Sequence, residues 1–288
     1  DTEALTGFVT VDKIPYISAS YSAHLTDAKK TPYNFFACAD YTTMLRAGLK
    51  YIKDNWKEKR APKVVFIYPN HPYGIAPIKG GKEYAKELGF EVLGDENVDL
   101  KAIEANSQLL SVKEKGADFA WVGGTVNSTA VILKDAKKLG LATKFGSNPY
   151  GFSEALPAVA KESAEGATGV VPHVPFGENV PGMKRLVEFH QKNHPSDSHD
   201  AMYVRGWCYV LTWTEALRRA DKAGQLNGPG IKAAVETLKD FDLGGLTSNV
   251  TYTSTDHRPS TKTPIYMVKD GKLAKVAEYD MPRRQDWL

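Results

Sequence analysis

Hydroxyl, amide and tyrosine side chains follow four apolar, strand-like runs of the sequence. The segments are SASYS after Ile17, YPNHPYG after Ile67, GGTVNS after Val122 and SNPYG after Phe145. Such groups, beside glycines that let the backbone approach a ligand, suit hydrogen bonding to a small carboxylate. None of the four segments sets a nucleophile beside a base, so they indicate binding rather than catalysis.

The same segments also have structural interpretations. Serines before a helix often form caps and turns, which applies to residues 18–22. Tyr73 and Tyr150 can pack over a sheet, and Arg205 can either anchor a carboxylate or extend from its helix to the surface. The recurrence of such groups at several strand ends favours binding.

The elements that would position these segments alternate between strand and helix from residue 63 onward. The strands KVVFIYP, FEVLG, DFAWVGG and TKFGSNP are separated by helices, two of which end at Gly116 and Gly140. This alternation predicts an α/β fold with a mostly parallel sheet flanked by helices. Because ligands bind beyond the carboxyl ends of such strands, the loops should meet at one edge.

The regular alternation of strands and helices ends after residue 151. The glycine- and proline-rich residues 166–182 are interpreted as a crossing segment, followed by helices over 200–224 and 231–239. Two strands, TPIYMV and LAKVAEY, are joined by a turn over 269–272. The chain is expected to switch body near residues 37–41, 174–177 and 243–247. It also begins as if in the middle of an α/β unit, so an earlier segment is expected to be missing or to be supplied elsewhere.

Composition argues against several classes of protein. The net charge of +3 comes from 37 basic and 34 acidic residues, so no surface for nucleic acid is expected. No apolar run approaches the length of about 20 residues that crosses a bilayer. Cys38 and Cys208 are either buried free thiols or one disulfide.

Cofactor and metal signatures are also missing from the sequence. The segment GIAPIKGGK lacks the spacing of a phosphate loop, and no G-x-G-x-x-G follows a strand, so no cofactor is expected. Ser153 in GFSEA lacks the second glycine of a nucleophile elbow and is interpreted as a helix cap. His190, His194 and His199 flank the helix-breaking Pro195, so no metal site is expected.

Taken together, the segments IPYISASYSAHLT, YPNHPYG, DFAWVGGTVNSTAVILKDAKKLGLATKFGSN and SAEGATGVV resemble the periplasmic leucine/isoleucine/valine-binding protein family. These are type I solute-binding proteins of ABC transporters. The resemblance implies a two-lobed fold, each lobe a mostly parallel sheet flanked by helices, with three interlobe crossovers. It places residues 1–38 and 176–243 in lobe I, which would lack its N-terminal part, and 39–175 and 244–288 in lobe II.

The resemblance also implies a set of ligand-binding residues in the interlobe cleft. The loop with Ser20, Tyr21 and Ser22 would hold the ligand's polar groups from lobe I. The residues from lobe II would be Tyr73, which closes over the ligand, together with Gly124, Thr125, Asn148 and Tyr150. Trp207 would face the cleft from a helix of lobe I.

One position departs from the pattern of amino-acid binders in this family. Those proteins usually carry an acidic residue in the loop that matches SNPYG, where it pairs with the ligand's ammonium group. This chain has Asn148 and Tyr150 there, although Glu154 can still reach in. A buried ammonium without an anionic partner is unfavourable, so an aromatic or other apolar acid competes with a standard amino acid as the ligand.

The predicted function is therefore capture of a small carboxylate by a non-enzymatic, monomeric protein of the periplasm or cell envelope, which delivers the ligand to an ABC transporter permease. A ligand-sensing domain of a receptor or regulator with the same fold is one alternative. An α/β enzyme is another, and it would need a nucleophile–base pair or a cofactor loop.

Overall fold

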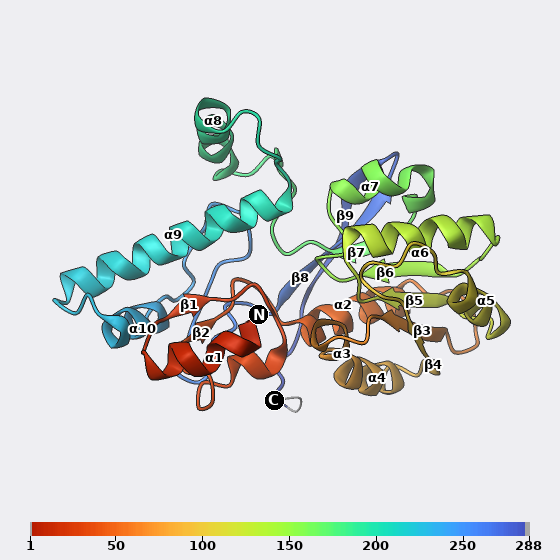
Figure 1. Cartoon of the computed structure of the whole chain (residues 1–288), viewed down its shortest axis with the longest axis horizontal. Helices are drawn as coiled ribbons and strands as arrows, with labels where there is room; N and C mark the ends of the chain where they lie inside the picture. Colours follow the sequence, from red (N-terminus) through yellow and green to blue (C-terminus); the bar gives the residue numbers. More distant parts are fainter. Residues whose placement is uncertain (1, 286–288) are drawn as a thin grey trace. The chain divides into compact units, whose positions relative to one another are not determined.

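The structure, a computed structural model, describes residues 2–285, which divide into two compact units (Figure 1). Unit 1 comprises residues 2–40, 172–262 and 282–285, and unit 2 comprises 41–171 and 263–281. The chain therefore passes from one unit to the other after residues 40, 171, 262 and 281.

The third passage corrects the predicted lobe boundaries. Lobe II was predicted to resume at residue 244, yet residues 244–262 belong to unit 1. Val250 and Tyr252 lie in the hydrophobic core of that unit, and the Tyr252 hydroxyl donates to the Phe36 carbonyl at 2.6 Å. Gly244 and Gly245, within the predicted switch at residues 243–247, have φ of 68° and 74° and lie within unit 1. The short segment 282–285 also returns to unit 1, and the predicted residues 286–288 of lobe II lie outside the described range.

Unit 2 is built on a seven-stranded sheet in the order β4-β3-β5-β6-β7-β8-β9. The strands are β3 (Lys63–Tyr68), β4 (Glu91–Asn97), β5 (Phe119–Val122), β6 (Lys144–Ser147), β7 (Thr168–Val170), β8 (Lys262–Lys269) and β9 (Lys272–Asp280). Strands β4, β3, β5, β6 and β7 pair in parallel, and β8 pairs antiparallel to β7. The mostly parallel sheet predicted from the alternation is confirmed.

The helices of unit 2 follow its strands along the chain. They are α2 (Tyr41–Asp54), α3 (Pro72–Ile75), α4 (Ile78–Glu87), α5 (Asn106–Glu114), α6 (Val126–Lys138), α7 (Ala155–Ala160) and the 3-10 helix η2 (Lys161–Ala164). Helix α2 packs on α4, and α6 packs on α7 (Figure 1). Because helices cover the sheet, β5 is buried along its whole length and β3 is buried except at its two ends.

Local turn chemistry accounts for several element ends. Gly116 and Gly140 have φ of 63° and 62° just after α5 and α6, the left-handed conformation that ends a helix. Asp270 and Gly271 have φ of 52° and 70° between β8 and β9, as a type I′ hairpin turn requires. The predicted turn at 269–272 is confirmed. Strand β7 was not predicted, because it lies inside the glycine- and proline-rich segment interpreted as a crossing.

Unit 1 contains a short parallel pair of strands, β1 (Tyr16–Ile17) and β2 (Asn34–Phe35). Its helices are α1 (Thr2–Val11), the 3-10 helix η1 (Ala23–Thr26), α8 (Met183–Asn193), α9 (Ala201–Lys222) and α10 (Gly228–Glu236). Phe35 of β2, Val204 and Cys208 of α9 and Leu238 share one hydrophobic core. Long helix α9 therefore provides much of the support for the N-terminal segment.

Candidate functional site

The loops after β3, β5 and β6 lie at one edge of the unit 2 sheet. These strands are neighbours in the order β3-β5-β6 and run in parallel, so their carboxyl ends share that edge. Helix N-termini, with their partial positive charge, also lie at this edge of a parallel sheet. The edge is therefore suited to an anionic or polar ligand group.

Three tyrosines form a cluster at this edge, called here the tyrosine wall: Tyr41, Tyr73 and Tyr150. Their ring centroids are 5.3 Å apart for Tyr41–Tyr73, 5.8 Å for Tyr73–Tyr150 and 6.3 Å for Tyr41–Tyr150, each pair edge to face. Such pairs are favoured by the aromatic quadrupole and hold the rings in fixed orientations. The structure thus brings together the two predicted tyrosines and adds Tyr41.

Tyr73 forms hydrogen bonds through its hydroxyl and through its backbone N–H. Its hydroxyl donates to the carbonyl of Gly124 at 2.7 Å and is also hydrogen-bonded to the Asn148 side chain. Its backbone N–H donates to Nδ1 of His71 at 3.2 Å, at the start of α3. Tyr73, Gly124 and Asn148, predicted from three separate loops, therefore lie in one hydrogen-bonded group.

Gly124 and Thr125 form the turn into α6. A Cβ on Gly124 would meet Oγ of Ser128, so the turn requires glycine. The N–H of Thr125 donates to Oγ of Ser128 at 3.0 Å, one half of a capping box. Thr125 is half-buried at the helix start, where it acts as the N-terminal cap of α6.

Asn148 occupies the position where the family resemblance implies an acid. Its side chain is buried, and Oδ1 accepts from the N–H of Gly151 at 3.1 Å. Glu154 is half-buried just before α7. The group next to Tyr73 at this loop is therefore an uncharged amide.

The serine-rich segment of unit 1 folds back on itself. Oγ of Ser18 donates to the carbonyl of Ser20 at 2.5 Å, and the hydroxyls of Ser20 and Ser22 are 3.3 Å apart. Tyr21 is buried, with its ring edge to face on Phe36. Its hydroxyl lies 2.5 Å from the hydroxyl of Tyr209 in α9.

Helix α9 adds residues that the sequence analysis did not connect with this segment. The Tyr209 hydroxyl also donates to the carbonyl of Ser18 at 3.4 Å, and the Arg205 guanidinium lies 5.9 Å from the centroid of the Tyr209 ring. Arg205 and Tyr209 are four residues apart, which places them on one face of the helix. That four-residue spacing was the signal in the sequence that could have connected the two residues.

Trp207 is not brought to this group. A separation of two residues puts it on the opposite face of α9 from Arg205 and Tyr209. Its ring centroid is 5.2 Å from that of Phe189, and it packs against the hydrophobic core of unit 1. Trp207 therefore packs within unit 1, and Tyr209 is the aromatic residue of α9 that lies against the serine-rich segment.

His173 is a further buried polar residue near Tyr209. The two ring centroids are 6.4 Å apart, and within residues 2–285 no group hydrogen-bonds to its Nε2. Burial, and secondarily the positive charge of Arg205, lowers the pKa of His173 to about 3. The imidazole is therefore neutral at physiological pH.

The depressed pKa of His173 makes the stability of the fold depend on pH. The unfolded chain, in which the histidine pKa is about 6.5, binds this proton more readily, so stability is full above pH 6.5 and falls as the pH is lowered. Between pH 6.5 and 5 the wild type should lose about 1–2 kcal/mol more than His173→Gln in urea unfolding. Substituting the half-exposed His24 instead should not remove this pH dependence, and equal slopes for wild type and His173→Gln would contradict the assignment.

His190 and His199 contact aromatic side chains, and both cysteines are buried. His190 and His199 pack edge to face at 4.9 Å, beside Phe176. Cys38 and Cys208 are free and buried, which confirms the thiol interpretation over a disulfide. Burial raises the pKa of the Cys208 thiol to about 12.

In the part of the chain that the structure describes, no helix has the length and hydrophobicity needed to cross a membrane. Comparison with known sequences gives 23% identity over 227 residues to a leucine-, isoleucine-, valine-, threonine- and alanine-binding protein of Pseudomonas aeruginosa. The match covers 75% of this chain but only 58% of that relative, so the chain spans little more than half of its length.

Solved structures share the fold over almost the whole chain. A substrate-binding protein of Aeropyrum pernix is 29% identical, with a TM-score of 0.90 over 100% of this chain and 76% of that one. A branched-chain amino acid transporter protein of Thermus thermophilus with bound valine is 23% identical, with a TM-score of 0.88 over 99% and 76%. A solute-binding protein of R. palustris in complex with benzoate is 17% identical, with a TM-score of 0.80 over 96% and 74%.

The family model described as "Periplasmic binding protein" matches residues 1–272. This match covers nearly all of the chain, and the mostly parallel sheet agrees with it. The chain belongs to the periplasmic binding protein family.

Proposed function

We propose that this chain is the extracytoplasmic substrate-binding protein of an ABC transporter. It captures a small carboxylate-bearing solute in the interlobe cleft that the family resemblance implies and delivers it to a membrane permease. It acts as a monomer, in the periplasm or cell envelope, and carries out no catalysis. The tyrosine wall is the observation that carries this proposal, because three oriented rings beside a helix start suit an acid with an apolar body.

The uncharged amide of Asn148 disfavours a ligand that carries an ammonium group. An α-amino acid brings an ammonium group that needs an anionic partner when it is desolvated. The relatives include binders of branched-chain amino acids and of benzoate. Asn148 beside Tyr73 favours an aromatic or other apolar acid over an amino acid for this chain.

A thermal-shift screen of the protein tests the proposal. Benzoate, hexanoate and isoleucine represent the three ligand classes, and glutamate and arginine serve as polar controls. A ligand at 100 times its Kd stabilises the folded state by about 2.7 kcal/mol, which corresponds to a rise in Tm on the order of 5 °C. Benzoate or hexanoate should give the largest shift, and no shift with any apolar acid would contradict the proposal.

Ser22→Ala is expected to weaken binding of the best acid by about five- to tenfold, the effect of losing one hydrogen bond of about 1 kcal/mol. Its hydroxyl is next to that of Ser20, in the loop predicted to hold the carboxylate. Isothermal titration calorimetry measures the change, with the exposed Ser107→Ala as the matched control. An affinity equal to that of the control would exclude Ser22 from the site.

A further inference from the structure

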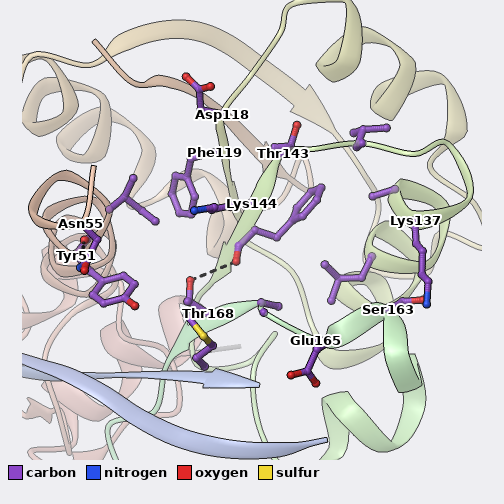
Figure 2. A pocket seen from close by; sticks show the side chains of 18 of the residues that line it. Tyr51, Asn55, Asp118, Phe119, Lys137, Thr143, Lys144, Ser163, Glu165 and Thr168 are labelled. Atoms are coloured by element: carbon purple, nitrogen blue, oxygen red, sulfur yellow. Dashed lines mark hydrogen bonds between the residues drawn. The ribbon is translucent and has the colours of Figure 1, made fainter. Parts of the chain in front are cut away.

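Unit 2 contains a cavity at the opposite end of its sheet from the tyrosine wall. Its volume is about 470 Å³, within the range of about 300–1,000 Å³ of small-molecule sites. Phe119 and Lys144, the first residues of β5 and β6, line it, so it lies at the amino ends of strands whose carboxyl ends lead to the tyrosine wall. Figure 2 shows this cavity with residues of α2 on one side and of α6 and η2 on the other.

The floor of the cavity is apolar and buried. It consists of side chains from α6 and from the two strands, namely Leu133, Ala136, Phe119 and Phe145. Met267 of β8 and Leu141 extend the apolar surface toward the rim. Such a floor favours a ligand with an aromatic or branched aliphatic body.

The acidic groups around the cavity are already paired. Asp118 accepts two hydrogen bonds from Arg60, at 2.6 and 2.7 Å. Glu165 accepts from the backbone N–H groups of Asp270 and Gly271, at 2.9 and 3.3 Å. The third acid, Glu162, lies 3.4 Å from Nζ of Lys137. At the C-terminal end of helix α6, which carries a partial negative charge, the carbonyl of Leu139 is also paired. It accepts a hydrogen bond from Nζ of Lys113 at 2.7 Å.

Lys144 differs from these groups in the pairing of its charge. Within residues 2–285 its ammonium makes no ion pair or hydrogen bond, whereas the other charged side chains of the lining are satisfied. Lys144 is exposed at the cavity, and Phe119 is its register partner on the neighbouring strand, as Figure 2 shows. A cation without an anion, next to an apolar floor, is complementary to an apolar acid.

We propose that this cavity is a second ligand site, which binds a small carboxylate with an aromatic or branched apolar body. The carboxylate pairs with Lys144, and the body lies on Phe119, Leu133 and Phe145. The site is independent of the tyrosine wall, and its occupancy does not depend on the function proposed above.

The test uses 4-fluorobenzoate as the probe and protein labelled with ¹³C at the methionine methyl groups. Met267 lines the cavity, so its methyl resonance should shift saturably with the probe, while that of Met183 in unit 1 should not. Lys144→Gln should weaken this titration roughly two- to fivefold, the range for one exposed ion pair. Ser163→Phe, which fills the rim, should abolish it, and the exposed Lys79→Gln is the matched control.

Tyr73→Ala separates this site from the proposed transport site. The Met267 titration should be unchanged in Tyr73→Ala, even where that variant no longer binds a solute at the tyrosine wall. A Met267 resonance that does not move, or one that moves equally in wild type, Lys144→Gln and Ser163→Phe, overturns the proposal.

Discussion

Replacing Arg258 with methionine is expected to lower the free energy of unfolding by about 3–5 kcal/mol. The Arg258 side chain is fully buried, and its guanidinium donates to Asp40 at 3.1 Å and to Asp256 at 2.8 and 3.0 Å. Burial alone would raise the pKa of Asp256, but the hydrogen bonds from Arg258 outweigh it and lower that pKa. Without the guanidinium, two buried carboxylates lose their principal cation.

Urea unfolding measures this loss, and Arg283→Met is the matched control. Arg283 also donates to Asp256, at 2.8 Å, but its side chain is 41% exposed, so its removal should have an effect below about 1 kcal/mol. Adding Asp256→Asn to Arg258→Met should recover part of the stability, because it removes one of the stranded charges. Equal destabilisation by Arg258→Met and Arg283→Met would contradict this account of the cluster.

Tyr73→Ala should weaken binding of the best acid by about 10- to 100-fold, equivalent to about 1.4–2.8 kcal/mol. The substitution removes the ring that contacts both Tyr41 and Tyr150, together with the hydrogen bond to Gly124. Isothermal titration calorimetry gives the affinity, and the Tm without ligand reports whether the fold is retained.

Tyr73→Phe serves as the control, because it keeps the ring and loses only the hydroxyl. Its affinity should lie between those of the wild type and Tyr73→Ala. If both variants bind the acid as tightly as the wild type while their folds are intact, the tyrosine wall is not part of the binding site.

The parts of the fold that depend on local pattern could be predicted from the sequence. Strands β3 and β5 are continuous buried runs, and the ends of α5 and α6 need only a glycine in the left-handed conformation. Strand β7 could not be predicted in this way, because its three residues are a strand only through pairing with β6 and β8. The passage after residue 262 was misplaced for the same reason, since Tyr252 belongs to unit 1 through its distant contact with Phe36.

The candidate site was predictable on unit 2 and only partly on unit 1. Tyr73, Gly124 and Asn148 follow parallel neighbouring strands, so strand order alone brings them together. On α9, Tyr209 rather than Trp207 contacts Tyr21, because of the face that the helix turns toward the N-terminal segment. The sequence of the helix alone does not show which face that is.

The central claim is that a small apolar acid binds against the tyrosine wall. A crystal structure of the protein with the acid that gives the largest rise in Tm tests this most directly. Ligand density is expected in contact with the rings of Tyr73 and Tyr150 and next to Asn148. Density for the acid only elsewhere on the protein, with no ligand at these three residues, would contradict it.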